Sequence, residues 1–220
     1  MRRAELGLYL VTDSGVTSGR NLVAMVEKAV SGGVTMVQVR EKHSETGDFV
    51  DLAMKMKEVL APYHVPLIIN DRIDVALAVD ADGVHIGQKD MPYALARQIL
   101  GPGKIIGLSI ETLDELEVAN DQDVDYVAAS PVFATPTKTD TARPWGLDGL
   151  REFCLRSAHP VVAIGGMNES TVTEVMEAGA DGVAVVSAIL AADDPQAAAR
   201  NISRLLQASM GHHQRQNNRR

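Results

Sequence analysis

Residues 31–42 read SGGVTMVQVREK, passing from turn residues through an apolar run into alternating amide and cationic side chains. The two glycines are typical of a turn from a helix into a strand. Because every second residue of a strand lies on the same face, one face of this strand is expected to change from apolar to polar along its length. That face carries Val34 and Met36, expected in the lower interior of the fold, and then Gln38, Arg40 and Lys42.

A similar turn pattern, with glycine directly before valine, recurs at two distant points of the chain, Ala81-Asp82-Gly83-Val84 and Ala180-Asp181-Gly182-Val183. Between such turns, short β-branched runs alternate with longer amphipathic stretches such as 21–31, the pattern of repeated βα units. The expected strands are 7–12, 34–40, 66–70, 83–87, 105–109, 125–129, 161–165 and 182–186.

Eight strand–helix alternations in 220 residues predict an α/β protein with a single (β/α)₈ TIM barrel, a fold of about 250 residues. An open doubly wound sheet is the alternative. Such a sheet usually carries a glycine-rich phosphate loop after its first strand. That position reads Thr12-Asp13-Ser14-Gly15, so the barrel is favoured.

Composition narrows the classes of function. The formal net charge of −8 argues against a nucleic-acid partner, and no apolar run approaches the ~18 residues of a membrane helix. The single Cys154 fits a reducing cytoplasm and is interpreted as a small core residue. We expect a cytoplasmic catalytic domain over residues 1–208 and a polar, disordered tail over 209–220; a homo-oligomer stays open.

The active site of such a barrel gathers at the carboxyl ends of the strands, called here the mouth. Two carboxylates fall at neighbouring strand ends, Asp71 after the third strand and Asp90 after the fourth. Hard oxygen ligands of this kind suit Mg²⁺, which also takes waters and substrate phosphates. Taken singly, each aspartate is more readily explained as the N-cap of the next helix. Taken together beside Arg40 and Lys42, they favour a magnesium site.

Cationic side chains converge on the same place. Arg40 and Lys42 end the second strand, and Lys138 lies in the long loop after the sixth. With a divalent metal they would form a site for a highly charged anion such as a diphosphate.

A second anion site is predicted after strands seven and eight, the recurrent phosphate site of this fold. Gly165-Gly166 allows close backbone approach, and Val186-Ser187 begins the next helix. Two phosphorylated substrates follow. No Ser-His-Asp set or Cys-His pair stands at the mouth, and His85, inside a strand, is more readily interpreted as a satisfied core residue. The chemistry is therefore expected to depend on electrostatics and positioning.

With these residues assembled, the sequence closely resembles the thiamin phosphate synthase (thiamin-phosphate pyrophosphorylase) family over roughly residues 8 to 206. The motifs that carry the resemblance lie in family order. They are Gln38-Val39-Arg40-Glu41-Lys42, Ile69-Asn70-Asp71-Arg72, His85-Ile86-Gly87-Gln88-Lys89-Asp90, Ser109, Thr135-Pro136-Thr137-Lys138, Ala163-Ile164-Gly165-Gly166 and the segment from Ala180 to Ser187.

The resemblance implies a transferase that joins a hydroxymethylpyrimidine diphosphate to a thiazole phosphate, releasing diphosphate. It implies Mg²⁺ on Asp71 and Asp90. The pyrimidine diphosphate would be held by Gln38, Arg40, Lys42, Asn70, Ser109 and Lys138, with Lys138, Arg40, Lys42 and Ser109 as the catalytic residues. The thiazole phosphate would be held by Thr135, Thr137, Gly166, Val186 and Ser187.

Two rival functions remain. A thiazole tautomerase of the same barrel type would not need both aspartates together with Lys42 and Lys138. A non-catalytic regulatory barrel would bind thiazole phosphate without turnover. A phosphosugar isomerase is less favoured, because it would want an acidic base at the mouth and no diphosphate site.

Overall fold

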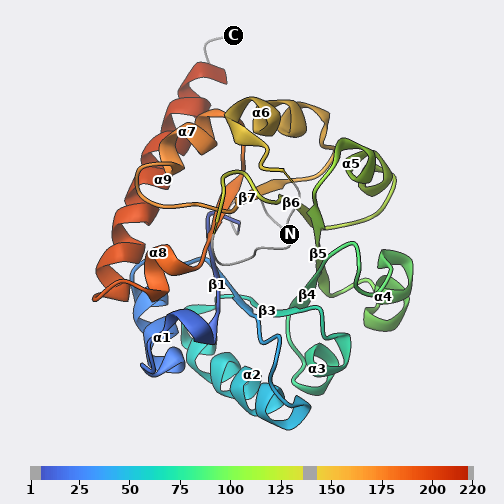
Figure 1. Cartoon of the computed structure of the whole chain (residues 1–220), viewed down its shortest axis with the longest axis vertical. Coiled ribbons are helices and arrows are strands. Elements are labelled where there is room, and N and C mark those ends of the chain that lie inside the picture. The colour runs from blue at the N-terminus through green and yellow to red at the C-terminus, as the bar shows by residue number, and fades with distance from the viewer. Residues whose placement is uncertain (1–5, 136–142, 218–220) are drawn as a thin grey trace.

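The computed structural model describes residues 6–135 and 143–217 as a closed barrel of parallel strands surrounded by helices (Figure 1). Each strand pairs with the next in sequence, and β8 pairs with β1 to close the barrel. The strands are β1 Leu8–Val11, β2 Met36–Val39, β3 Leu67–Asn70, β4 Gly83–Ile86, β5 Ile105–Ile110, β6 Tyr126–Ala129, β7 Val161–Ile164 and β8 Gly182–Val185. The predicted fold class and all eight predicted strands are confirmed, with ends that differ by at most two residues.

The helices cover the outside of the barrel (Figure 1). They are α1 Leu22–Ser31, α2 Thr46–Leu60, α3 Ile73–Ala78, α4 Tyr93–Leu100, α5 Leu113–Asn120, α6 Gly146–Arg156, α7 Val172–Glu177, α8 Ser187–Leu190 and α9 Pro195–Asn217, with short 3₁₀ turns at Ser14–Val16 and Ala61–Tyr63. Helix α9 ends at Asn217, beyond residue 208. The division into a domain of residues 1–208 and a tail of 209–220 stays a prediction. Within the described residues, no helix is long and apolar enough to span a membrane.

Two hydrophobic clusters divide the core. The larger lies between the strands and the helices, and the smaller fills the barrel. Met36 belongs to the inner cluster, as predicted from the strand period, whereas Val34 belongs to the outer one. The prediction for Val34 was wrong because β2 begins only at Met36, and the alternation of faces does not extend back through the turn at Gly33, where φ is 111°.

A side-chain hydrogen bond repeats four times at the amino ends of the strands. Before each even-numbered strand, a side chain accepts a bond from the first or second backbone N–H of the preceding odd-numbered strand. The four bonds are Leu8 N to Thr35 Oγ1 at 3.0 Å, Leu67 N to Asp82 Oδ2 at 2.8 Å, Ile106 N to Asp125 Oδ2 at 2.9 Å and Val161 N to Asp181 Oδ2 at 2.9 Å. They join the strands in pairs at the face opposite the mouth, where side chains serve stability.

Cys154 lies in α6, half-buried, and packs against the larger hydrophobic cluster at its edge, although it was predicted as a core residue. Burial raises the pKa of its thiol to about 12. The thiol is therefore protonated at neutral pH, which agrees with a structural role because the thiolate is the reactive form.

Candidate active site

A cavity of about 520 Å³ occupies the mouth of the barrel. Its lining includes eleven of the thirteen residues predicted from the sequence to form the site: Gln38, Arg40, Lys42, Asn70, Asp71, Asp90, Ser109, Thr135, Gly166, Val186 and Ser187. The other two, Thr137 and Lys138, lie outside the described residues. Residues far apart in the chain are thus brought to one cavity, because parallel strands of a barrel all end on the same side.

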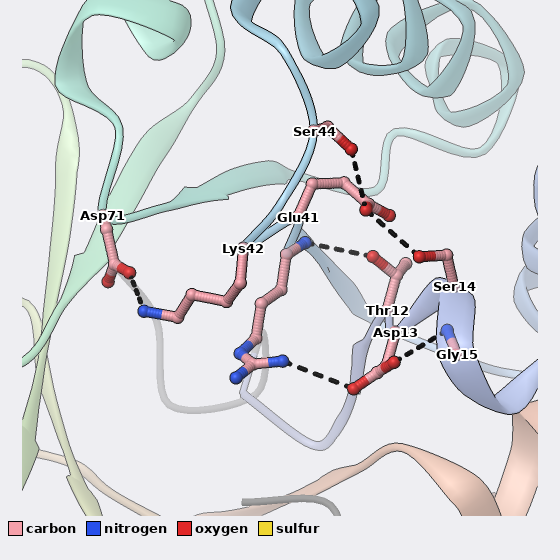
Figure 2. A network of polar contacts seen from close by, with 9 residues as sticks. Thr12, Asp13, Ser14, Gly15, Glu41, Lys42, Ser44 and Asp71 are labelled. Atoms are coloured by element: carbon pink, nitrogen blue, oxygen red, sulfur yellow. Dashed lines mark hydrogen bonds and ion pairs between the residues drawn. The ribbon is translucent and has the colours of Figure 1, made fainter.

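The carboxylates of Asp71 and Asp90 lie in contact on one side of the cavity. Burial raises the pKa of Asp90, and the contact with the carboxyl group of Asp71 raises it further. Lys42, which also lines the cavity, extends toward Asp71 and donates from Nζ to its Oδ2 (Figure 2). Two carboxylates in contact repel each other when both are ionised, so this place stabilises a positive charge.

The simpler interpretation of these aspartates as helix N-caps is wrong. The N-cap of α3 is Arg72 and that of α4 is Pro92, and neither helix has a side-chain cap. Asp90 Oδ2 instead accepts a bond from the N–H of Gly87 at 2.7 Å. Asp71 has a φ of 59°, in the left-handed region, and its N–H donates to the carbonyl of His85 at 2.8 Å. Such backbone strain in a residue other than glycine is concentrated at functional positions.

This pair of carboxylates fits Mg²⁺ as part of a shared site. Within the two described ranges, no group of three or more His, Cys, Asp and Glu side chains lies close enough to hold a metal ion. Magnesium is commonly bound by one or two carboxylates, with waters and substrate phosphates as its other ligands. Asp71 and Asp90 therefore suit a magnesium ion that is bound together with a phosphorylated substrate.

Arg40 is held at both ends by the segment that follows β1. Its backbone N–H donates to Thr12 Oγ1 at 3.0 Å, and its Nη1 lies 3.3 Å from Asp13 Oδ2. The other carboxylate oxygen of Asp13 accepts a bond from Gly15 N at 2.9 Å (Figure 2). Thr12 is fully buried. The guanidinium of Arg40 is thus fixed over the cavity before any ligand binds.

The residue between the two cations points the other way. Glu41 Oε2 accepts bonds from the hydroxyls of Ser14 and Ser44, both at 3.1 Å (Figure 2). These bonds join the loop after β2 to the loop after β1. They also keep a carboxylate away from Arg40 and Lys42, because successive residues of an extended segment point to opposite sides.

The opposite side of the cavity is built from backbone. Gly165 and Gly166 follow β7 with φ values of 96° and 70°. A Cβ atom at Gly165 would lie 2.6 Å from Pro131 Cβ, and one at Gly166 would lie 2.8 Å from Phe133 Cβ. Both positions therefore need glycine, and the bare backbone lines the cavity.

The β8 side of the cavity is fixed by Arg20. Its guanidinium donates to the carbonyls of Leu190 at 2.6 Å and Ala192 at 2.7 Å, at the end of α8. Because Arg20 lies in the loop between β1 and α1, it joins that loop to the segment that begins with Val186 and Ser187.

Five side chains form a continuous chain of hydrogen bonds across the floor of the cavity. Gln38 Nε2 donates to the Tyr9 hydroxyl at 2.7 Å, and the Tyr9 and Tyr126 hydroxyls are 2.9 Å apart. His85 Nδ1 lies 2.9 Å from the Tyr126 hydroxyl, and His85 Nε2 lies 2.8 Å from Ser109 Oγ. The two ends, Gln38 and Ser109, were predicted as site residues from the sequence. The two tyrosines were missed.

The chain requires a glycine beneath it. A Cβ atom at Gly107 would lie 2.0 Å from Tyr126 Cζ, so only glycine leaves room for this ring. His85 stacks on Tyr126 with ring centroids 5.6 Å apart. The interpretation of His85 as a satisfied core residue is correct for its burial, yet His85 also lines the cavity. The available signal for His85 in the sequence was that it is a polar side chain on the inward face of its strand, the face that carries the predicted site residues.

The fold and the cavity define the class of protein. This is a (β/α)₈ enzyme of phosphorylated substrates, with a charged side and a backbone side facing each other across one mouth. The family model of thiamine monophosphate synthase matches residues 8–189. The chain belongs to this family.

Relatives and a solved structure agree with this assignment. The chain is 52% identical to the thiamine-phosphate synthase of Albidiferax ferrireducens over 94% of this chain and 95% of that one. It is 53% identical to the thiamine-phosphate synthase of Vibrio campbellii over 87% of this chain and 93% of the relative. The structure of thiamine phosphate pyrophosphorylase from Pyrococcus furiosus superposes with a TM-score of 0.87 at 36% identity, covering 95% and 99% of the two chains.

Proposed function

We propose that the chain condenses 4-amino-2-methyl-5-hydroxymethylpyrimidine diphosphate with thiazole phosphate, giving thiamine phosphate and diphosphate. The observation that carries the proposal is the cavity itself. It has cations and paired carboxylates on one side, which we call the diphosphate side, and bare backbone on the other. The names of the relatives support the same reaction.

The chemistry is a displacement at the pyrimidine methylene carbon. The carbon–oxygen bond to the diphosphate breaks and its electron pair leaves with the diphosphate. The resulting pyrimidine carbocation accepts the lone pair of the thiazole nitrogen, which forms the new carbon–nitrogen bond. No proton need be removed in these steps, which agrees with a mouth whose prominent groups are cations and hydrogen-bond donors.

The side chains of the diphosphate side are proposed to stabilise the departing group. Arg40 is already oriented by Asp13, and its guanidinium can donate two parallel bonds to phosphate oxygens. Lys42 is held over the cavity by Asp71. Preorganised charges of this kind stabilise charge that develops in the transition state. We also assign Gln38, Asn70, Ser109 and Lys138 to this substrate, Lys138 from the sequence motif alone.

Mg²⁺ is proposed as the cofactor, with Asp71 and Asp90 as its protein ligands. When bound, it would neutralise part of the charge on the diphosphate and so make it a better leaving group. Asp90 is kept in place by the N–H of Gly87 and Asp71 by its bond to the His85 carbonyl. The protein thus presents both carboxylates in fixed positions.

The thiazole phosphate is proposed to bind on the backbone side. Gly166 allows a phosphate to approach the main chain closely, and Val186 and Ser187 line the same wall. Thr135 also lines the cavity, and Thr137 is added from the motif. We further propose that the enzyme works in the cytoplasm on these two small molecules, supported by the single cysteine and the net charge of −8.

An assay of purified protein tests the proposed reaction. Both substrates and Mg²⁺ are supplied, and thiamine phosphate and diphosphate are measured in equal amounts if the proposal is correct. Chelation of the metal with EDTA should abolish turnover, and added Mg²⁺ should restore it. Binding of thiazole phosphate without product would favour the regulatory barrel. Isomerised thiazole phosphate, with no diphosphate released, would favour the tautomerase.

A further inference from the structure

The hydrogen-bond chain on the floor of the cavity begins at Gln38 and ends at Ser109, with two buried tyrosines between them. Tyr9 and Tyr126 are almost completely buried, whereas Gln38 and Ser109 line the cavity at opposite ends of the chain. The chain passes from β2 through β1, β6 and β4 to β5. It therefore connects two groups of the cavity that come from non-adjacent strands.

Each hydroxyl in the middle of the chain carries one proton. Burial raises the pKa of the Tyr9 and Tyr126 hydroxyls above the ordinary value, so both are neutral at physiological pH. A neutral hydroxyl with two partners donates to one of them and accepts from the other. The direction of one bond in the chain therefore fixes the direction of the next.

The direction starts at Gln38. Its Nε2 donates to Tyr9, so the proton of Tyr9 is directed to Tyr126 and that of Tyr126 to His85 Nδ1. A neutral imidazole that accepts at Nδ1 carries its proton on Nε2, which then donates to Ser109 Oγ. We propose that these five side chains form one polarised relay, in which the hydrogen-bonding role of Gln38 sets the tautomer of His85 and the direction of the Ser109 hydroxyl.

The relay gives its two ends complementary roles toward a ligand. Gln38 uses its Nε2 within the chain, which leaves its carbonyl oxygen as the acceptor of the amide. Ser109 accepts from His85, which leaves its own proton to donate. A ligand that contacts both ends can donate to the Gln38 carbonyl oxygen or accept from the second N–H of Gln38 Nε2, and at Ser109 it meets a hydroxyl whose proton is available to donate. This consequence for ligands rests on the proposed function, whereas the relay itself is a property of the free protein.

The tautomer of His85 can be read by NMR in the free protein, independently of any activity. The chain is labelled with ¹⁵N-histidine, and long-range ¹H–¹⁵N spectra are recorded at pH 9. The His85 signals are assigned by their loss in His85→Gln. In the unmodified protein, we expect a neutral ring with its proton on Nε2. A proton on Nδ1, or a doubly protonated ring, would overturn the proposal without any variant of the relay.

Gln38→Glu then reverses the start of the relay. Beside Arg40 and Lys42 at this pH, the new side chain is a carboxylate, which can only accept. Tyr9 must then donate to it, Tyr126 to Tyr9, and His85 to Tyr126, so the ¹⁵N shifts of the two ring nitrogens should exchange. Gln38 is separated from His85 by two tyrosines, and a change of tautomer at that separation is the signature of a relay.

The matched control keeps the charge and removes the connection. In the double variant Gln38→Glu with Tyr9→Phe, the same carboxylate is present but the hydroxyl that links it to Tyr126 is gone. We expect the tautomer of His85 there to be the same as in Tyr9→Phe alone, because the carboxylate at position 38 no longer reaches Tyr126 through hydrogen bonds. An unchanged tautomer in folded Gln38→Glu would contradict the relay. An equal exchange in the double variant would show a through-space effect of the charge and would contradict it as well.

Discussion

The two sides of the cavity are built on different physical principles. The side formed after β2, β3 and β4 uses charged side chains that contact one another: Arg40 with Asp13, Lys42 with Asp71, and Asp71 with Asp90. The side formed after β7 and β8 uses bare backbone at Gly165 and Gly166, held against the segment that follows β6. One side depends on charge and the other on space.

Because of this difference, substitutions on the two sides should affect turnover, binding and stability differently. Loss of a charged side chain on the first side leaves the backbone in place, so it should lower the rate while folding is largely preserved. An added atom on the second side meets packed neighbours and a left-handed backbone, so it should affect stability and binding together. Substitutions on the two sides can therefore be told apart by measuring turnover, binding and unfolding on the same variants.

Asp71→Ala tests the charged side most severely. It removes one of the two proposed magnesium ligands and the partner of Lys42, so kcat should fall by about 100- to 1,000-fold, the usual cost of losing a preorganised electrostatic contact. Thermal unfolding should change little. Steady-state kinetics at saturating Mg²⁺ and both substrates measure the effect.

Asp74→Ala is the matched control for that substitution. Asp74 lies three residues further along the same segment, forms an exposed ion pair with Arg72 and does not line the cavity. Its loss should leave kcat within about twofold, because exposed ion pairs contribute little. Equal losses of turnover in the two variants would show that the segment, and not the carboxylate at 71, matters for catalysis.

Gly165→Ala tests the backbone side. The new Cβ would approach Pro131 Cβ at 2.6 Å, at a φ of 96°. We expect the free energy of unfolding to fall by about 1–3 kcal/mol, the usual cost of a strained backbone position, and KM for thiazole phosphate to rise about tenfold, a change of 1.4 kcal/mol in binding. KM for the pyrimidine diphosphate should stay the same. Denaturant unfolding and kinetics with each substrate varied in turn measure these effects.

Gly47→Ala is the control for Gly165→Ala, because it makes the same substitution at a glycine with open space around it. Gly47 lies in the first turn of α2, and a Cβ there would meet nothing within 4 Å. Gly47→Ala should leave both KM values unchanged and leave stability equal or slightly higher, because alanine favours a helix. If Gly165→Ala bound both substrates as well as the unmodified protein does, the phosphate would not depend on the backbone at this position.

The charged side was largely predictable from the sequence. Gln38, Arg40 and Lys42 alternate on one face of a strand, and in a barrel that face leads to the mouth. No contact distant in sequence is needed for that inference. The capping interpretation of Asp71 and Asp90 was wrong for a reason the sequence does not contain, since the start of each following helix depends on how the loop folds.

The side-chain contacts at the floor of the cavity and at the amino ends of the strands were not predictable in the same way. Tyr126 lies in the expected strand 125–129, but its inward position depends on the space left by Gly107 on the neighbouring strand. The Ala-Asp-Gly-Val repeat was recognised as a turn, yet the bonds of Asp82 and Asp181 to distant N–H groups depend on strand register. Partners of this kind are fixed by the folded chain and leave no local pattern.

Asp13→Asn has the smallest expected effect, and it tests whether the Arg40 guanidinium must be oriented as well as present. Asp13→Asn keeps an oxygen that can accept from Gly15 N–H but removes the carboxylate that orients the Arg40 guanidinium. KM for the pyrimidine diphosphate should rise about fivefold, equivalent to roughly 1 kcal/mol, the net contribution of one such hydrogen bond. KM for thiazole phosphate and the melting temperature should not change, which a general loss of structure would not reproduce.

Asp148→Asn is the control for Asp13→Asn, because Asp148 pairs with Arg151 on the exposed surface of α6, away from the cavity. It should leave both KM values unchanged. A lower KM for the pyrimidine diphosphate in Asp13→Asn would mean that Asp13 repels the incoming anion more than it orients Arg40. In that case the negative charge of Asp13 would weaken binding of the diphosphate, and the charged side would not be a preorganised anion site.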